Sequence, residues 1–479
     1  MEKNIFNKSK KSRRGIVFPK LDVEESNIPS WIKRDNEIGL PSVSELDVVR
    51  HFTKLSQKNF SVDTNFYPLG SCTMKYNPKI NEFAASLDGF LNVHPYQEIF
   101  QIQGALEVIY ELEQALAKIT GLPYVTLSPN AGAHGEFVGV SLIKKYFESK
   151  NDPRNIAIIP DSAHGTNPAS AAMIGFKTVQ VKSNPEGTVD ISHLKELISK
   201  DVACIMLTNP NTLGLFEKDI LEISKIMKQN GSLLYYDGAN LNAIVGKVRP
   251  SDMGFDVMHI NLHKTFSTPH GGGGPGSGPV CVSERLKDFL PNPIISKRLN
   301  KDKYEFFIQN PSESSISRVR WFFGNFLVLL KAYVYIISLG KNGLKMVSER
   351  AVLNANYLKN KLKNIFPVPY NDHCMHEFVI SIKNLKSQTG VTASDIAKRL
   401  IDYGIHPPTV YFPLIVQEAM MIEPTETESK EILDDFISVM ETIYKESLND
   451  NTMLKDAPFK TRLSRLDEAK AVKEPKLTL

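Results

Sequence analysis

The sequence predicts an α/β protein built on a doubly wound, mostly parallel sheet. Between about residues 123 and 283, short runs rich in Val and Ile are separated by amphipathic stretches. Most of the runs lack apolar–polar alternation, as expected of strands buried on both faces. Repetition of strand and helix favours parallel pairing with helices on both sides. The predicted strands are Tyr124–Ser128, Asn155–Pro160, Lys177–Val181, Val202–Thr208, Leu233–Tyr236, Val257–Asn261 and Val280–Ser283.

Helix signals lie between these strands. Glu136–Ser149 follows a Gly-Ala-His-Gly turn, and Ser192–Ser199 opens with a serine suited to capping. Ile220–Gln229 ends at Asn230-Gly231, a typical helix stop. Each of these helices connects two predicted strands, which supports the doubly wound arrangement.

The remaining segments predict additional domains. Residues 317–362 indicate a long helix with a break near Gly340, and residues 366–443 a smaller α/β domain. The charged segment from Asn449 is expected to be extended or mobile. The sequence therefore predicts four parts. Residues 1–95 form an N-terminal extension with an active-site loop, and residues 96–330 form a large cofactor-binding domain. Residues 331–448 form a small domain, and residues 449–479 form a charged tail.

Composition excludes several classes of protein. A net charge of +4 over 479 residues implies no broad nucleic-acid-binding field. Four widely spaced cysteines predict reduced thiols in a cytoplasmic protein rather than disulfides or structural zinc. Charge without a following apolar run argues against a secretory signal at the N-terminus. The apolar stretch Trp321–Leu339 is interrupted by Asn325 and Lys331, so a buried helix is expected rather than a membrane span.

The strongest functional signal is Lys264 within Asn261–Phe266, where a predicted strand ends and a glycine tract, Gly271–Gly278, follows. Asp237 ends another predicted strand upstream. A lysine that bonds covalently to the cofactor, paired with an acid beside the ring nitrogen, is typical of pyridoxal 5'-phosphate (PLP) sites. The alternatives are a surface lysine beside a flexible loop and an ordinary Asp-Gly turn.

A phosphate group fits the loop before the Glu136 helix. Gly132 and Ala133 allow close backbone approach, and the free N–H groups of the helix favour an anion. His134 projects from the first turn and is predicted to stack on the ring. His263 is a candidate phosphate donor. The competing interpretations are a helix N-cap loop that binds no ligand and structural histidines.

Polar residues also follow two other predicted strands. His164 and Thr166 come after one strand, and Asn209, after the next, is predicted to bond the cofactor's phenolic oxygen. Because parallel strands bring their carboxyl ends to one sheet edge, these residues are expected to converge on the same site.

These motifs together resemble the glycine cleavage system P-protein, a PLP-dependent glycine decarboxylase family. The resemblance is carried by Asn261–Phe266, Pro269–Gly276, Asp237–Asn240, Ser162–Ser170 and Tyr67–Met74, and spans nearly the whole chain. It implies PLP-dependent transferase fold type I, as in aspartate aminotransferase. It also implies that Lys264 bonds PLP, that Asp237 meets the ring nitrogen, and that Ala239 and His134 enclose the ring.

The resemblance further implies a reaction and partners. Glycine loses CO2, and its aminomethyl group passes to the lipoyl disulfide of H-protein. The chain matches the cofactor-carrying second subunit, with a cofactor-free subunit 1 expected as partner in an α2β2 heterotetramer. Tyr67–Pro78 and Gly271–Gly278 are the candidate walls of a channel for the lipoyl group.

Three rival functions are weighed against this one. Another decarboxylase or aminotransferase of the same fold could use the same lysine and acid. A noncatalytic interaction subunit need not retain Lys264 and Asp237, so their presence argues against it. The single interrupted apolar stretch argues against a membrane transporter.

Overall fold

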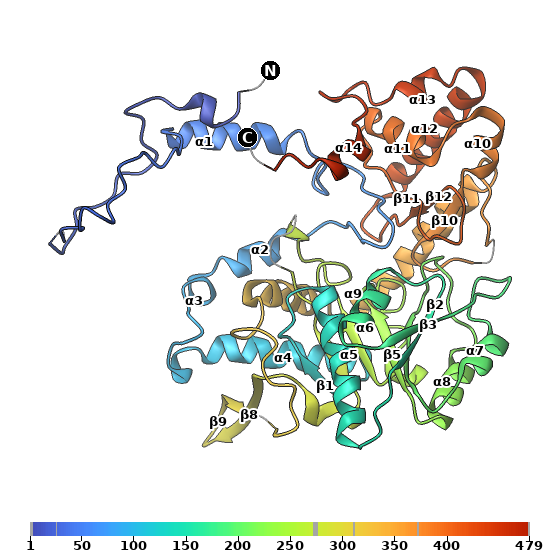
Figure 1. Ribbon diagram of the computed structural model, residues 1–479, viewed down its shortest axis with the longest axis horizontal. Coiled ribbons are helices and arrows are strands. Elements are labelled where there is room, and N and C mark those ends of the chain that lie inside the picture. Colours follow the sequence, from blue (N-terminus) through green and yellow to red (C-terminus); the bar gives the residue numbers. More distant parts are fainter. Residues whose placement is uncertain (1–2, 25, 272–275, 310–311, 371–372, 478–479) are drawn as a thin grey trace. The chain divides into compact units, whose positions relative to one another are not determined.

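The computed structural model describes residues 3–24, 26–271, 276–309, 312–370 and 373–477 (Figure 1). The chain forms two compact units, residues 1–64 and 65–479. The first holds the 3-10 helix η1 (Phe6–Lys8) and the helix α1 (Glu45–Ser56), which a reciprocal Ser44–Asp47 capping box begins. The second unit, residues 65–479, contains the large sheet and the small C-terminal layer.

The second unit is organised around a seven-stranded sheet in the described residues, with strand order β1-β7-β6-β5-β4-β2-β3. All pairings are parallel except those of β7 with its two neighbours. The predicted strands are therefore confirmed, with ends shifted by one or two residues. They are β1 (Tyr124–Thr126), β2 (Ile156–Pro160), β3 (Lys177–Val181), β4 (Val202–Thr208), β5 (Leu233–Gly238), β6 (Val257–Ile260) and β7 (Val280–Val282).

Helices cover both faces of this sheet (Figure 1). Tyr236 of β5 joins the core beneath α4, α7 and α8, whereas Tyr235 joins the core beneath α5 and α6. This burial explains the unbroken apolar runs in the sequence. The helices are α4 (Gln103–Thr120), α5 (Gly132–Ser149), α6 (Thr166–Met173), α7 (Ile191–Leu197) and α8 (Ile220–Gln229).

One helix start differs from the prediction. Asp190, not Ser192, caps α7, because its carboxylate accepts the N–H groups of Ser192 and His193. Short elements complete this part of the chain: α2 (Lys79–Ala85), α3 (Asp88–Leu91), η2 (Ile99–Gln101), η3 (Pro250–Met253), η5 (Glu284–Phe289) and the hairpin β8 (Ile294–Asn300) and β9 (Lys303–Gln309).

The long helix α9 (Phe326–Leu362) contains the predicted break. Gly340 has φ 59° and ψ −172°, a conformation that residues with a Cβ rarely adopt. The helix begins nine residues later than position 317. Within the described chain, α9 is the one helix long and apolar enough to span a membrane, and 39% of its most apolar window is buried in the fold.

The C-terminal part is a small α/β layer with strand order β10-β12-β11. The expected tail from Asn449 is partly packed, because a short helix there buries Leu454 and Ala457 completely. The elements are β10 (Phe378–Ser381), α10 (Lys383–Thr389), α11 (Ala393–Asp402), β11 (Thr409–Val410), β12 (Ala419–Ile422), α12 (Lys430–Asn449), α13 (Thr452–Asp456) and α14 (Glu468–Lys473).

The turn-rich segment 65–78 is an ordered loop packed on the small layer. Leu69 forms an antiparallel bridge with Ile422, and the Gly70 N–H donates to the Met421 carbonyl at 3.3 Å. A Cβ at Gly70 would overlap Met421, so this approach requires glycine.

Lys75, in the same loop, is a buried cation that binds several parts of the second unit. Its side chain is 2% exposed, and its Nζ lies 2.6 Å from Glu426 Oε1. It also donates to the Thr265 carbonyl at 2.7 Å, to Asn242 Oδ1 at 3.1 Å and to Tyr335 Oη at 3.1 Å. Burial lowers the pKa of Lys75, but the charges of Glu426 and Tyr335 and their hydrogen bonds together outweigh it, and the net pKa is raised.

Replacing Lys75 with methionine is expected to destabilise the chain by about 3–5 kcal/mol, because Glu426 would stay buried without its cation. Chemical denaturation of the cofactor-free chain measures the change. Lys225→Met, on the exposed side of α8, is the matched control and should change stability by less than about 0.5 kcal/mol. A Lys75 variant as stable as the control would contradict this account.

Candidate active site

A cavity of about 250 Å³ lies at the carboxyl edge of the large sheet. Loops from the large sheet, the segment 65–78 and the small layer all contribute to it. Its lining residues are Ser71, Ala131, Gly132, Ala133, Glu136, His164, Thr166, Thr208, Pro210, Thr212, Asp237, Ala239, Asn240, Asn261, His263, Lys264, His376 and Glu377. Besides Lys264 itself, seven of the other nine residues predicted for the site line this single cavity: Asp237, Ala239, Gly132, Ala133, His263, His164 and Thr166.

Asp237 is held as a carboxylate at the end of β5. Strand register places it beside His259 of β6, whose Nε2 lies 3.4 Å from Asp237 Oδ1. The Ala239 N–H donates to the same oxygen at 3.1 Å. Burial raises the pKa of Asp237, but His259, this N–H and Lys264 together hold it below its ordinary value. A negative charge therefore faces the cavity from the sheet.

Glu136, in the first turn of α5, has the opposite character. Thr166 and Ser170 donate hydroxyl hydrogen bonds to it at 2.7 and 3.1 Å, and His259 Nε2 lies 3.9 Å away. Burial, followed by the charge of Asp237, raises the pKa of Glu136 to about 8. Two neighbouring buried carboxyl groups resist a second negative charge, so Glu136 keeps its proton while Asp237 is ionised.

Lys264 lies in the turn after β6, with its N–H donating to the Asn261 carbonyl at 3.1 Å. The next residue, Thr265, accepts the Leu241 N–H at 2.7 Å, which attaches this turn to the segment after Asp237. Among the described residues, the Lys264 ammonium has no hydrogen-bond or ion-pair partner. An unpaired amine opposite a carboxylate is thus available for reaction.

An anion site is formed at the start of α5. Ala131 is the N-cap and offers no side-chain cap, so the first N–H groups of an 18-residue helix are open toward the cavity. A Cβ at Gly132 would collide with Asn261, which keeps the loop close to the Lys264 turn. His263 Nδ1, Asn261 Oδ1 and Thr208 Oγ1 are buried without hydrogen-bond partners. Such atoms in a cavity indicate a polar ligand.

Two predicted site residues lie elsewhere. The Asn209 side chain accepts the Glu217 N–H at 2.9 Å and contacts Met253, so the expected bond to a ligand is not available. Thr208, one residue earlier, lines the cavity instead, since alternate residues of a strand face opposite sides. His134 is half-buried outside the cavity lining, and its Nδ1 accepts the Asn130 N–H.

The lining residues that were not predicted from the sequence include Glu136, Thr208, His376 and Glu377. Glu136 and Thr208 adjoin predicted site residues, and their position at a helix start and a strand end was the available signal. His376 and Glu377 come from the small layer and carry no such signal. The predicted channel wall Gly271–Gly278 includes residues 272–275, which lie outside the described residues, whereas Ser71 of the other predicted wall lines the cavity.

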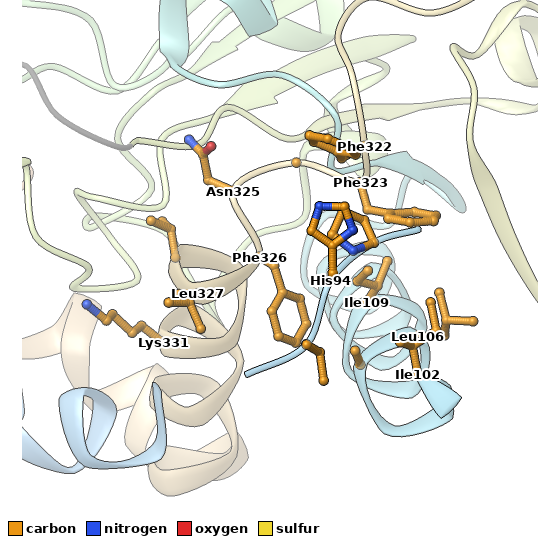
Figure 2. Close-up of a pocket in the computed structure, with 15 residues that line it drawn as sticks. His94, Ile102, Leu106, Ile109, Phe322, Phe323, Asn325, Phe326, Leu327 and Lys331 are labelled. Carbon is orange, nitrogen blue, oxygen red and sulfur yellow. The ribbon is translucent and has the colours of Figure 1, made fainter. Parts of the chain in front are cut away.

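A second pocket, of about 540 Å³, lies between α4 and the start of α9. Figure 2 shows its apolar walls, which include Leu106, Ile109 and Phe326, with Lys331 on the α9 side. No carboxylate is among its described lining residues, so it lacks the paired charges of the first cavity.

Residues 347–461 match the family described as glycine dehydrogenase, C-terminal domain, and residues 138–297 match aminotransferase class V. The chain is 56% identical over 472 residues to a probable glycine dehydrogenase (decarboxylating) subunit 2 of Thermotoga petrophila, covering 98% of each chain. The chain belongs to the glycine dehydrogenase (decarboxylating) subunit 2 family. A relative of the same name from Staphylococcus epidermidis is 57% identical over 476 residues, covering 98% of this chain and 94% of that one.

Solved structures support the fold. A glycine decarboxylase (P-protein) of the glycine cleavage system, in inhibitor-bound form, superposes with a TM-score of 0.74 at 19% identity, covering 88% of this chain and 93% of that one. A cysteine desulfurase from Thermococcus onnurineus gives 0.62 at 16% identity, covering 80% and 95%. The fold is PLP-dependent transferase fold type I, as predicted.

The cavity fits PLP, the cofactor of this family. The uncapped α5 N-terminus and His263 suit a phosphate, and the Asp237 carboxylate suits a protonated ring nitrogen. The unpaired Lys264 amine suits the aldehyde carbon, and the unpaired Thr208 hydroxyl offers a further bond.

Glu136→Gln is expected to stabilise the cofactor-free chain at alkaline pH. The pKa of Glu136 is about 8 in the fold and about 4.5 when unfolded. Because the fold prefers the protonated form, its stability falls as pH rises between these values. Glutamine removes this loss, so the unfolding midpoint should exceed that of the unmodified chain by several degrees at pH 9 and match it at pH 5. The exposed Glu148→Gln is the control; a shift independent of pH would argue against a buried proton on Glu136.

Proposed function

We propose that the chain is the cofactor-carrying subunit of a glycine dehydrogenase (aminomethyl-transferring). It decarboxylates glycine with PLP and passes the aminomethyl group to the lipoyl disulfide of an H-protein. The supporting observation is a cavity in which an unpaired lysine amine faces a buried carboxylate, in a chain at least 54% identical to named members of that family.

When bound, PLP supplies an electron-accepting ring that takes up the pair released by the departing CO2. Asp237 keeps the ring nitrogen protonated, and His259 and the Ala239 N–H keep Asp237 charged. Gly132, Ala133 and His263 bind the phosphate. Thr166 acts through Glu136, to which its hydroxyl donates.

Lys264 is proposed to act twice. Its amine holds the cofactor before glycine arrives, and after displacement it is a free base within the cavity. The carbon–carboxylate bond of glycine breaks, and the aminomethyl carbon bonds to one lipoyl sulfur. The sulfur–sulfur bond breaks, and the second sulfur takes a proton to become a thiol.

The ring faces are proposed to lie between Ala239 and His164. His164 lines the cavity, and the charges of Asp237 and Lys264 act on its imidazole. His134, the residue first expected to stack, is bonded within its own loop. His164 lies in the loop between β2, which ends at Pro160, and α6, which begins at Thr166.

The name "subunit 2" in the relatives indicates a partner subunit 1. We further propose that this partner is the homologous cofactor-free subunit, that the two form an α2β2 heterotetramer, and that the enzyme works in the cytoplasm. The loop 65–78, with Ser71 on the cavity, is proposed as one wall of the lipoyl channel.

Lys264→Ala is expected to lower glycine decarboxylation by roughly 1000-fold or more, because both the cofactor link and the base are lost. The assay is CO2 release from carboxyl-labelled glycine by the purified chain with PLP, its partner subunit and lipoylated H-protein. The visible absorption band of bound PLP should respond to glycine in the unmodified enzyme and not to bulkier amino acids. Lys225→Ala is the control.

The PLP absorption band also distinguishes the alternative functions. A band indifferent to glycine, with keto acid turnover, would indicate another enzyme of this fold. Absence of any band with PLP and partner would indicate a noncatalytic subunit.

The two candidate stacking residues, His164 and His134, predict different effects of an alanine substitution on PLP binding. His164→Ala should weaken PLP binding by about 3–10-fold, the range for loss of one aromatic stacking contact. His134→Ala should leave the dissociation constant within twofold, because His134 does not line the cavity. Fluorescence titration of each cofactor-free variant measures the constants. The reverse ranking would restore His134 as the stacking residue.

A further inference from the structure

Two buried carboxyl groups enter the site from the small layer. Glu377 directly precedes β10 and Glu423 directly follows β12, and the antiparallel pairing of Phe378 with Ile422 sets them side by side. Their exposed fractions are 3% and 0%. One oxygen from each and one His376 nitrogen lie within 4.8 Å of one another. Proximity of this kind disfavours two negative charges.

Hydrogen-bond donors distinguish the two acids. Glu423 accepts the Thr73 hydroxyl at 2.7 Å, the Thr73 N–H at 3.1 Å and the Asn240 amide at 3.1 and 3.3 Å. Among the described residues, Glu377 accepts one bond, from the Ser71 N–H at 2.7 Å. The four hydrogen bonds to Glu423 favour its ionised form, so the proton of the pair is favoured on Glu377, which lines the cavity.

The electrostatic surroundings of Glu377 and Glu423 favour one proton held between them. His376 is 2% exposed, both its ring nitrogens lack hydrogen-bond partners, and burial lowers its pKa to about 3, so it is neutral. Burial and then the Glu423 charge raise the pKa of Glu377 to about 8, and burial raises that of Glu423 to about 7. The nearby Lys264 charge lowers both pKa values in part.

Two thiols also face the pair. Burial raises the pKa of Cys72, and the charges of Lys264, Glu423 and Glu377 act on it. Burial raises the pKa of Cys374 to about 12, with a contribution from Glu377. Both thiols are neutral at pH 7, so they add no charge that would displace the proton.

We propose that Glu377 and Glu423 hold one proton between them and that Glu377 delivers it to the sulfur released when the lipoyl disulfide opens. This role rests on the proposed function. The carbon–sulfur bond forms as the sulfur–sulfur bond breaks, the leaving sulfur takes the proton, and Glu377 becomes a carboxylate that water reprotonates. Glu423 is a positioning residue, because its charge keeps the proton on Glu377.

A metal ion is the competing occupant of these three side chains. Both oxygens of Glu423 already accept hydrogen bonds, and a cation would require both carboxyl groups to ionise. The donor pattern therefore favours a proton.

Infrared spectroscopy of the cofactor-free chain tests the proton without any enzyme activity. In a Glu136→Gln background, which removes the other carboxyl whose pKa is raised to about 8, a protonated-carboxyl band that titrates near pH 8 should be present, lost on Glu377→Gln and unchanged on the exposed Glu441→Gln. In Glu423→Gln the neighbouring charge is gone, so the band should persist and titrate at lower pH. Unchanged titration in both pair variants would overturn the proposal. One bound divalent ion per chain, lost in both variants, would do the same.

The rate of aminomethyl transfer then tests whether Glu377 delivers the proton. With lipoylated H-protein, Glu377→Gln should slow aminomethyl transfer by roughly 100-fold or more, within the range for loss of a general acid. In the unmodified enzyme the rate of aminomethyl transfer should fall as pH rises through about 8. In Glu377→Gln the rate should not show this fall. PLP loading and its spectral response to glycine should remain. Transfer at the unmodified rate would overturn the role of Glu377, whereas absence of glycine turnover in the unmodified enzyme would reject the proposed function and leave the infrared result standing.

Discussion

The buried ion pair between Lys75 and Glu426 is the interaction on which the site depends most. A single ammonium binds the loop 65–78, the turn after Lys264, the helix α9 and the small layer. Its bond to the Thr265 carbonyl holds the residue that follows Lys264. Because a buried cation without its anion is costly, these parts cannot separate independently. The position of the reactive amine is therefore coupled to the packing of the whole second unit.

The cavity is flanked by two carboxyl pairs with the same internal asymmetry. On the sheet side Asp237 is ionised and Glu136 has a raised pKa. On the small-layer side, counting the described residues, Glu423 accepts four hydrogen bonds and Glu377 accepts one. In each pair the neighbouring groups favour the charge on one acid, and the charge of Lys264 interacts with both Asp237 and Glu423. A lysine amine close to these carboxyl groups suits an electron-poor, phosphate-bearing ring.

Features that depend on residues close together in the sequence could be predicted from it. The strands could be recognised because burial on both faces demands apolar runs, and Asp237 and Lys264 could be recognised because strand ends in a parallel sheet meet at one edge. Asn209 was assigned wrongly because the choice between it and Thr208 depends on which way a strand's side chains point, and a shift of one residue reverses that direction.

The sequence by itself determined the fold, and it predicted the Lys264 motif, its acid and the glycine-rich anion loop, since each depends on neighbouring residues with a known geometric consequence. The tertiary structure alone decided which histidine lines the cavity, how many hydrogen bonds each acid of the two pairs accepts, and that Glu377 lines the cavity at all. Those properties arise from residues far apart in the chain, such as Ser71 with Glu377 and Thr73 with Glu423. Burial and donor number at such contacts follow from packing, which residue order does not reveal.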